Sequence, residues 1–159
     1  MADYIRYPAP LGELTVAAEG GAITALVIEE QKYFDRHLAG ADTERETPVL
    51  RQARQWLDRY FSGERPDPAL LPLAPKGTDF QKRVWQALLR IPYGATATYG
   101  ALAEALGSSA RAVGGATGRN PISVIIPCHR VLAADGSLNG YAGGLENKAK
   151  LLRLEGAIE

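Results

Sequence analysis

The sequence contains one cysteine, Cys128, among its 159 residues. A single thiol cannot form a disulfide within the chain, and it cannot build a cysteine-rich metal site. Cys128 is therefore either an inert buried thiol, which is the usual state of a free cysteine, or a nucleophile. A lone free thiol also agrees with a reducing compartment, so we expect a cytoplasmic protein.

Long apolar runs and metal-binding patterns are also missing. No stretch approaches the roughly 18 apolar residues that cross a membrane, and the N-terminus lacks the basic start and apolar core of a signal peptide. The two histidines, His37 and His129, lie far apart, so with one cysteine they match no zinc spacing. No glycine-rich phosphate motif precedes a helix. We expect no membrane contact, no metal and no cofactor, and we interpret His37 as a surface residue.

Charge is balanced overall but is unevenly distributed. Residues 1–79 hold 9 basic and 13 acidic side chains, whereas residues 80–130 hold 6 basic side chains and one acid. The basic segment includes the cysteine, which suggests a polyanionic partner. A chance cluster on a solvated face would give the same pattern, and the charge count alone does not separate the two interpretations.

The first part of the chain has the pattern of a small sheet followed by one helix. Short β-prone runs reach residue 28, and Gly20-Gly21 predicts a hairpin turn between two of them. Thr47-Pro48 predicts the start of a helix, with Thr47 as its cap, and Ser62-Gly63 predicts its end. The next segment is rich in proline, which is typical of a linker. We predict domains at 1–62 and 78–159, joined by a linker at 63–77.

The second domain has the pattern of short helices. Thr78 and Thr98 are predicted caps, the second for a helix that ends at Gly107. A tight turn then leads to a third helix at about 110–118, and two short helices joined in this way are the plan of a helix-turn-helix. Residues 122–126 predict a buried strand that leads to Cys128. Residues 146–153 predict the last helix.

The predicted helix at 110–118 is unusual because three of its residues are glycines, Gly114, Gly115 and Gly118. Each costs about 1 kcal/mol relative to alanine in a helix. Arg111 is its one long polar side chain, which does not fit a helix that reads bases in the major groove. Two interpretations remain: a smooth helix pressed into a DNA minor groove, or tight packing of this helix against another one inside the protein.

The residues after Cys128 suggest how its thiol could be activated. A free cysteine has a pKa of about 8.5, so a nucleophilic Cys128 needs surroundings that lower it. His129 is adjacent, but neighbours in an extended strand point to opposite faces, so the pair would need a turn or a bridging water. A histidine that acts as a base usually needs an orienting acceptor, and Glu155 is the candidate. Simple exposure of Glu155 near a frayed terminus is the alternative.

At this point the residues resemble a known family, the O6-alkylguanine-DNA alkyltransferases (methylated-DNA–protein-cysteine methyltransferases). The resemblance covers residues 72–156 closely and the N-terminal domain more weakly. The matching stretches are Gly77–Gln81, Ile91–Gly94, Thr98–Gly100, Arg111–Gly114, Asn120-Pro121, Pro127–Val131 and Gly140–Gly144.

The resemblance implies an α/β (α+β) fold. Its small N-terminal sheet-and-helix lobe would be ribonuclease H-like, and its C-terminal helical domain would be similar to a winged helix-turn-helix. It also implies a monomer that binds double-stranded DNA through the minor groove and flips the alkylated base out of the stack. Cooperative assembly on DNA is left open.

The resemblance further implies a repair reaction. The alkyl group of O6-alkylguanine, and by extension of O4-alkylthymine, would pass irreversibly to Cys128, so that one protein repairs one lesion. His129 would take the thiol proton through a water, Glu155 would orient His129, and Asn120 would brace the loop around the thiol. The implied DNA-binding residues are Tyr99, Ala110, Arg111, Ala112 and Gly115, with Arg111 filling the gap in the stack and Tyr99 also assisting catalysis. The implied base pocket consists of Val131, Tyr141, Ala142, Gly143 and Gly144.

Three other functions remain as alternatives. A lesion-binding protein similar to the alkyltransferases would lack the thiol, and Cys128 argues against it. A helix-turn-helix regulator would bind a specific DNA sequence whether or not it is alkylated. A cysteine hydrolase would turn over many times and would not explain the helix without long side chains.

Overall fold

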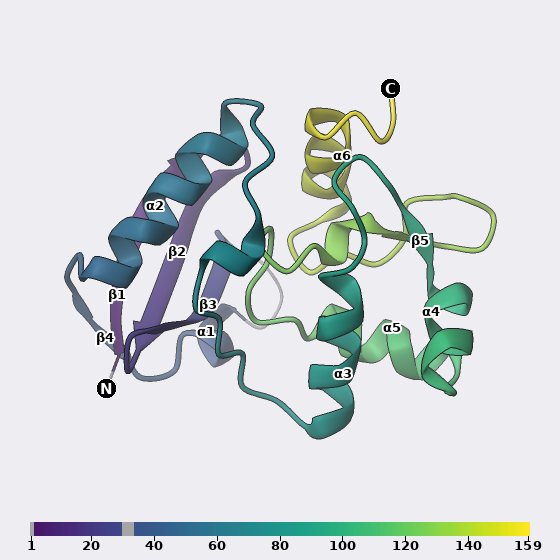
Figure 1. Cartoon of the computed structure of the whole chain (residues 1–159), viewed down its shortest axis with the longest axis horizontal. Helices are drawn as coiled ribbons and strands as arrows, with labels where there is room; N and C mark the ends of the chain where they lie inside the picture. The colour runs from purple at the N-terminus through teal and green to yellow at the C-terminus, as the bar shows by residue number, and fades with distance from the viewer. Residues whose placement is uncertain (1, 30–33) are drawn as a thin grey trace.

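The computed structural model describes residues 2–29 and 34–159, and it has a sheet at one side and a group of short helices at the other (Figure 1). The sheet has the strand order β3-β2-β1-β4, in which β1 pairs antiparallel with β2 and parallel with β4, and β2 pairs antiparallel with β3. Its strands are β1 Ala2–Ala9, β2 Gly12–Glu19, β3 Ala22–Ile28 and β4 Ala41–Glu44. The short helix α1 (Phe34–His37) precedes β4.

The hairpin between β2 and β3 confirms the predicted turn. Gly20 and Gly21 join the strands with φ of 60° and 79°, which is the left-handed region that a two-residue hairpin turn requires. Inward-facing residues such as Leu14, Val16 and Leu26 are fully buried, as the apolar spacing of the strands predicts.

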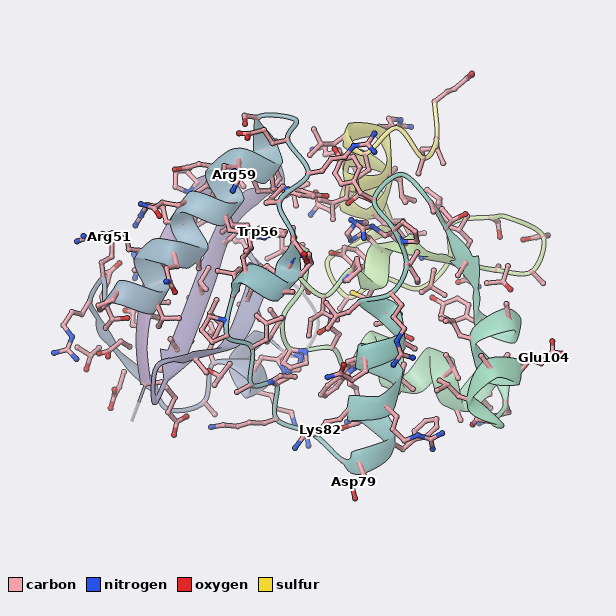
Figure 2. The ribbon with its side chains drawn as sticks, viewed as in Figure 1. Arg51, Trp56, Arg59, Asp79, Lys82 and Glu104 are labelled. Atoms are coloured by element: carbon pink, nitrogen blue, oxygen red, sulfur yellow. The ribbon has the colours of Figure 1, made fainter. Side chains whose placement is uncertain are left out.

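Helix α2 (Pro48–Phe61) covers one face of this sheet (Figure 1). Its buried stripe includes Leu50, Ala53 and Leu57, while Arg51 and Arg59 point away into solvent (Figure 2). Pro48 is the first residue of the helix, as predicted. Thr47 occupies the cap position, but its side chain makes no cap hydrogen bond, so the predicted role of Thr47 as a side-chain cap is wrong.

The proline-rich segment is held against the N-terminal lobe. It contains a short 3₁₀ turn, η1 (Pro68–Leu70), and Trp56 reaches toward it from α2 (Figure 2), donating its Nε1–H to the carbonyl of Asp67 at 3.1 Å. Farther on, Ile23 donates to the carbonyl of Pro72 and accepts from Ala74, both at 2.8 Å. The segment therefore runs beside β3 as an added, irregular edge.

The helices of the second part begin and end close to the predicted positions. Thr78 caps α3 with a full capping box to Gln81, Thr98 caps α4, and Ser109 caps α5. Trp85 of α3 donates to the carbonyl of Ala116 at 2.8 Å and thereby fixes α5 against α3. The remaining elements are α3 Asp79–Leu88, β5 Ala97–Thr98, α4 Tyr99–Leu106, α5 Ala110–Gly118, η2 Cys128–Arg130, β6 Val131–Leu132 and α6 Leu145–Leu154.

Residues 122–126 are fully buried, but the predicted strand there is wrong. Ile122 alone forms a bridge to β3, opposite Leu26. The chain then coils on itself: Val124 has a φ of 72°, and Ile126 donates to the carbonyl of Ile122 at 3.1 Å. A short apolar run indicates that a segment is buried, but it does not specify the backbone conformation. Here the side chain of Asn120 binds backbone groups that would otherwise pair with a neighbouring strand.

One continuous apolar core joins the two parts of the molecule. Leu26 of β3 donates to the carbonyl of Pro121 at 2.9 Å and accepts from Ser123 at 3.0 Å, so the buried loop that leads to Cys128 lies against the sheet edge. Within the described ranges, no helix is long and apolar enough to cross a membrane.

Candidate active site

Cys128 lies at the start of the single 3₁₀ turn η2, at the end of the buried loop. Its side chain is in the core, with 4% of the residue exposed. The turn places His129 and Arg130 directly after it, and both are buried as well. An extended strand was predicted before Cys128 and His129; the two residues instead lie in a tight turn, and both are buried.

Asn120 holds the loop that presents the thiol. Its Oδ1 accepts from the amide of Ile122 at 3.0 Å, and its Nδ2 donates to the carbonyls of Ile126 at 2.9 Å and Ile122 at 3.4 Å. The side chain is buried, so these bonds form out of water, where unmade bonds would be costly. Asn120 also interacts with the thiol of Cys128 and lowers its pKa.

His129 and Glu155 form a buried pair. The Nε2 atom of His129 lies 2.7 Å from Oε2 of Glu155, and both side chains are completely shielded from solvent. An ionised carboxylate can only accept, so Nε2 carries the proton and Nδ1 presents its lone pair. Among the described residues, Nδ1 has no hydrogen-bond partner. Burial, followed by the charges of Arg130 and Lys148, keeps the pKa of His129 below its ordinary value despite the pull of Glu155, so the imidazole is neutral.

Glu155 is buried at the C-terminal end of α6, and the alternative of an exposed residue at a frayed terminus is excluded. Arg130 binds both of its oxygens, through Nε at 2.7 Å and Nη2 at 3.0 Å, and Tyr60 donates to Oε2 at 2.5 Å. Burial alone would raise the pKa of this carboxyl, but the hydrogen bonds from His129 and Arg130 outweigh it and lower the pKa to about 2. Glu155 is therefore a fixed negative charge.

The thiol itself is neutral at rest. Burial raises the pKa of Cys128 to about 11, against smaller lowering effects of Asn120 and Lys148. The expectation that the surroundings lower this pKa is wrong for the free protein. Burial destabilises the thiolate by removing its water, and this effect is larger than the stabilisation of the thiolate by the nearby dipoles and charge. A thiolate must be formed at the moment of reaction.

Lys148 belongs to this cluster, although the sequence analysis did not select it. It is fully buried in α6, and its Nζ donates to the carbonyls of Val131 at 2.6 Å and Asn139 at 2.9 Å. Burial lowers its pKa to about 8, against a small opposite effect of Cys128. A signal was present in the sequence: Lys148 falls on the same helical stripe as Leu151 and Leu152, and a charge in an apolar stripe is seldom incidental.

A groove of about 780 Å³ opens beside this cluster, between α4, α5 and the loop at 139–142. Tyr99 is at its centre and donates to the carbonyls of Asn139 and Gly140, at 3.0 and 3.2 Å. Of the predicted base-pocket residues, Tyr141 and Ala142 line the groove. The other three do not: Val131 is fully buried beneath it, and Gly143 and Gly144 lie farther along the loop.

The predicted DNA-binding residues lie on one exposed face of α5. Ala110, Arg111, Ala112 and Gly115 are all exposed, and three of them, Ala110, Arg111 and Gly115, line the groove together with Tyr99, whereas Ala112 does not. Apart from its chain neighbours and the backbone of its own helix, no atom of the described residues comes within 4 Å of a Cβ built on Gly115. Packing against another helix of the protein therefore does not explain the glycine at position 115. A smooth outer surface of α5 does explain it.

His37, predicted to be a surface residue, is half-buried. Burial and the nearby charges of Arg36 and Arg119 lower its pKa. It is remote in sequence from Cys128 and does not line the groove. Among the described residues, no group of three or more metal-binding side chains is close enough to hold an ion.

The fold and the site together define a two-lobed protein with a helix-turn-helix, a buried cysteine and, from the next residue, a buried histidine–glutamate pair. Residues 79–157 match the family model described as the DNA binding domain of 6-O-methylguanine DNA methyltransferase, and residues 3–75 match the ribonuclease-like domain of the same protein. The chain belongs to the 6-O-methylguanine DNA methyltransferase family, and the resemblance drawn from its motifs is confirmed.

Individual relatives match over nearly their whole length. Methylated-DNA–protein-cysteine methyltransferase of Haemophilus influenzae is 45% identical, with 96% of this chain and 85% of the relative covered. The constitutive enzyme of the same name from Bacillus subtilis is 46% identical, covering 96% and 94%. A crystal structure of the Mycobacterium tuberculosis protein OGT in complex with DNA superposes with a TM-score of 0.84 at 42% identity, covering 98% and 93%. The predicted fold class is confirmed by these neighbours.

Proposed function

We propose that this protein repairs DNA by direct reversal, transferring the alkyl group of O6-alkylguanine irreversibly to the sulfur of Cys128. It is a methylated-DNA–protein-cysteine S-methyltransferase that acts once per molecule. The observation that carries this proposal is the buried thiol of Cys128, directly followed in sequence by the buried His129–Glu155 pair, beside an exposed helix-turn-helix groove. Family membership supports the same reaction and argues against a sequence-specific regulator or a hydrolase.

The reaction is a displacement at a saturated carbon. The thiol proton of Cys128 moves to Nδ1 of His129 through a bridging water, and the sulfur attacks the alkyl carbon in line with its bond to O6. The C–S bond forms as the C–O bond breaks, and the electron pair of that bond remains on guanine, which then takes up a proton. The imidazolium that forms is stabilised by the charge of Glu155, only 2.7 Å from Nε2.

The resting protonation states suit this sequence of events. His129 is neutral because burial lowers its pKa, so it can accept a proton, and Cys128 is a neutral thiol because burial raises its pKa. The thiol is therefore protected from adventitious electrophiles until a substrate is in place. Lys148 and Asn120 stabilise the developing thiolate, since both lower the pKa of Cys128.

DNA is the partner, and we propose that α5 enters the minor groove with its exposed small residues against the backbone. The buried position of Cys128 requires the damaged base to leave the stack. Arg111, which is exposed at the start of α5, fills the space it leaves. Tyr99 assists rotation of the 3′ phosphate and donates toward N3 of the departing guanine, for which its hydroxyl must leave the carbonyls of Asn139 and Gly140.

The base itself would bind against Tyr141 and Ala142, which line the groove; Val131, Gly143 and Gly144, which the family resemblance also implies, do not line it in the free protein. The same pocket chemistry extends to O4-alkylthymine, which presents an alkylated oxygen in a similar position. The protein acts as a monomer on each lesion.

The test is the intact mass of the protein after mixing with excess duplex that contains O6-methylguanine. The mass should increase by one CH₂ group in stoichiometric yield, with no change for Cys128→Ala or for undamaged duplex. An unchanged wild-type mass with DNA still bound would instead favour a lesion-binding protein. Release of product without a mass change would favour a hydrolase.

A further inference from the structure

One side chain of the N-terminal lobe reaches the candidate active site. Tyr60, in the last turn of α2, donates its hydroxyl to Oε2 of Glu155 at 2.5 Å, in a bond that is buried and spans 95 residues of sequence. The cysteine, histidine, asparagine and glutamate of the site all belong to the C-terminal part of the chain. Tyr60 is therefore a contact from one lobe to the catalytic network of the other.

The oxygen that Tyr60 binds is the one that His129 uses. Oε2 of Glu155 accepts from Tyr60, from Nε2 of His129 at 2.7 Å and from Nη2 of Arg130 at 3.0 Å, whereas among the described residues Oε1 accepts only from Nε of Arg130. A carboxylate oxygen has about two lone-pair sites. Three donors on one oxygen share its electron density, so the strength of the bond to His129 depends on Tyr60.

The ring of Tyr60 is held firmly in place. It stacks on Trp56 at 5.4 Å between centroids, and it meets the edges of Phe61 at 5.1 Å and Tyr93 at 6.2 Å. Tyr60 itself is 1% exposed. The position of its hydroxyl is thus set by packing within α2 and against Tyr93.

We propose that Tyr60 is a positioning residue for the transfer reaction: it locks Glu155 in the orientation that receives the Nε2–H of His129, and it limits how strongly the carboxylate attracts a second proton onto the imidazole. This inference rests on the proposed function. It assigns the N-terminal lobe a role beyond structural support, because the lobe then adjusts the base that activates Cys128.

The sign of the effect follows from the groups around the pair. The charged and titratable groups that face His129 or Glu155 are Tyr60 from α2, Tyr93 after α3, Arg130 in η2, Tyr141 in the loop, and Lys148 in α6. With the Tyr60 hydroxyl removed, Oε2 loses one donor and becomes a stronger acceptor. Protonated His129 is then favoured, so a neutral base is available only at higher pH.

The experiment compares Tyr60→Phe with Tyr7→Phe. Tyr7 lies in the same lobe and donates to a different carboxylate, Asp58, at 2.6 Å, so its variant loses the same kind of bond without touching Glu155. Single-turnover transfer from O6-methylguanine duplex is measured from pH 5 to 9. We expect Tyr60→Phe to react about tenfold more slowly at neutral pH, with the acid limb of its rate profile moved to higher pH. Tyr7→Phe should match the wild type, and both should bind DNA normally.

A second measurement does not depend on transfer. Nitrogen-15 spectra of imidazole-labelled protein report the protonation of the two histidines, and His37→Gln identifies the signals of His129. We expect a neutral ring protonated at Nε2 in the wild type, and a higher midpoint of protonation in Tyr60→Phe. If that variant does not fold, ring-fluorinated tyrosine at position 60, a stronger donor of nearly the same shape, should lower the midpoint instead.

The outcomes separate the two proposals. A wild type that gains no alkyl group would contradict the proposed function, while the histidine spectra would still test Tyr60. A wild type that reacts, with Tyr60→Phe equal to it in rate profile and in imidazole signals, would overturn this inference. A loss of rate shared equally by Tyr7→Phe would also overturn it, since it would show a general effect of the lobe.

Discussion

The side-chain amide of Asn120 donates to the carbonyl of Ile126 at 2.9 Å, across the buried loop that ends at Cys128. This one contact explains how an apolar segment with a positive φ at Val124 can remain in the core. Backbone bonds satisfy the amides of Ser123, Ile125 and Ile126, and Asn120 adds a partner for the amide of Ile122. The position of the thiol therefore depends on a residue eight places earlier in the chain.

Replacing Asn120 with alanine should leave the amide of Ile122 buried without its partner, and it removes one of the two donors to the carbonyl of Ile126, the other being the amide of Cys128. We expect unfolding in urea to show a loss of about 2–4 kcal/mol, together with slower alkyl transfer. Asn147→Ala, which removes a single partly buried bond to Gly143, should cost less stability. Equal losses in the two variants would mean that the brace is not specific to Asn120.

The low pKa of Glu155 predicts how stability changes in acid. The folded-state pKa of about 2 lies below the ordinary 4.5, so the ionised carboxylate stabilises the fold above pH 4.5, and this contribution disappears as the pH falls toward 2. It amounts to roughly 3 kcal/mol. Free energies of unfolding measured from pH 6 to 2.5 should show it.

A surface carboxylate provides the control for that acid transition. Glu46 binds Arg51 and Arg54 at the surface, so Glu46→Gln should keep nearly the wild-type profile. In Glu155→Gln the decline between pH 4.5 and 2 should be shallower, and overall stability lower, because Arg130 loses its buried partner. A wild type whose stability is flat across this range would contradict the assignment.

The lowered pKa of Lys148 predicts that stability increases as the pH becomes alkaline. Its folded-state pKa of about 8 lies below the ordinary 10.5. The buried charge therefore destabilises the fold at neutral pH, and this destabilisation disappears as Lys148 loses its proton above pH 8. Stability of the wild type relative to Lys148→Met should therefore increase by about 1–2 kcal/mol between pH 8 and 10. Calorimetry or urea unfolding at both pH values measures this.

The neighbouring Lys150 gives a matched control on the same helix. It is exposed and pairs with Glu146 at the surface, so Lys150→Met should show no such relative change. Lys148→Met should also slow alkyl transfer, since it removes a cation that lowers the pKa of Cys128. Normal transfer in this variant would show that the cation is not needed for the thiolate.

Gly115 predicts that stability and DNA binding change in opposite directions. A Cβ at this position meets no described atom within 4 Å outside its chain neighbours and the backbone of its own helix, so Gly115→Ala should stabilise the free protein by up to about 1 kcal/mol. The added methyl would stand on the exposed face of α5 and keep the helix from the DNA backbone. We expect a higher melting temperature and weaker binding to duplex, measured by fluorescence anisotropy at fixed salt. If Gly115→Ala binds duplex as tightly as the wild type, the DNA does not contact this face of α5.

Much of this protein was readable from local sequence. The glycine pair at 20–21, the caps at Thr78 and Thr98, and the motif around Cys128 each act over a few residues, so their patterns predicted the hairpin, the helices and the candidate nucleophile. The smooth face of α5 was also readable, because the absence of long side chains is a property of the segment itself.

Burial and long-range contact were decided by the tertiary structure alone. The apolar residues 122–126 predicted a strand, but the side chain of Asn120 made a coiled loop possible. Cys128 was expected to have a lowered pKa, yet the surrounding core raises it, because desolvation depends on everything packed around a group. Lys148 became part of the site through the folding of α6 onto the loop, and Tyr60 meets Glu155 only because the two lobes share one core. Local patterns determine the helices, the turns and the reactive groups that are present, whereas the distances between side chains remote in sequence determine the pKa values and orientations of those groups.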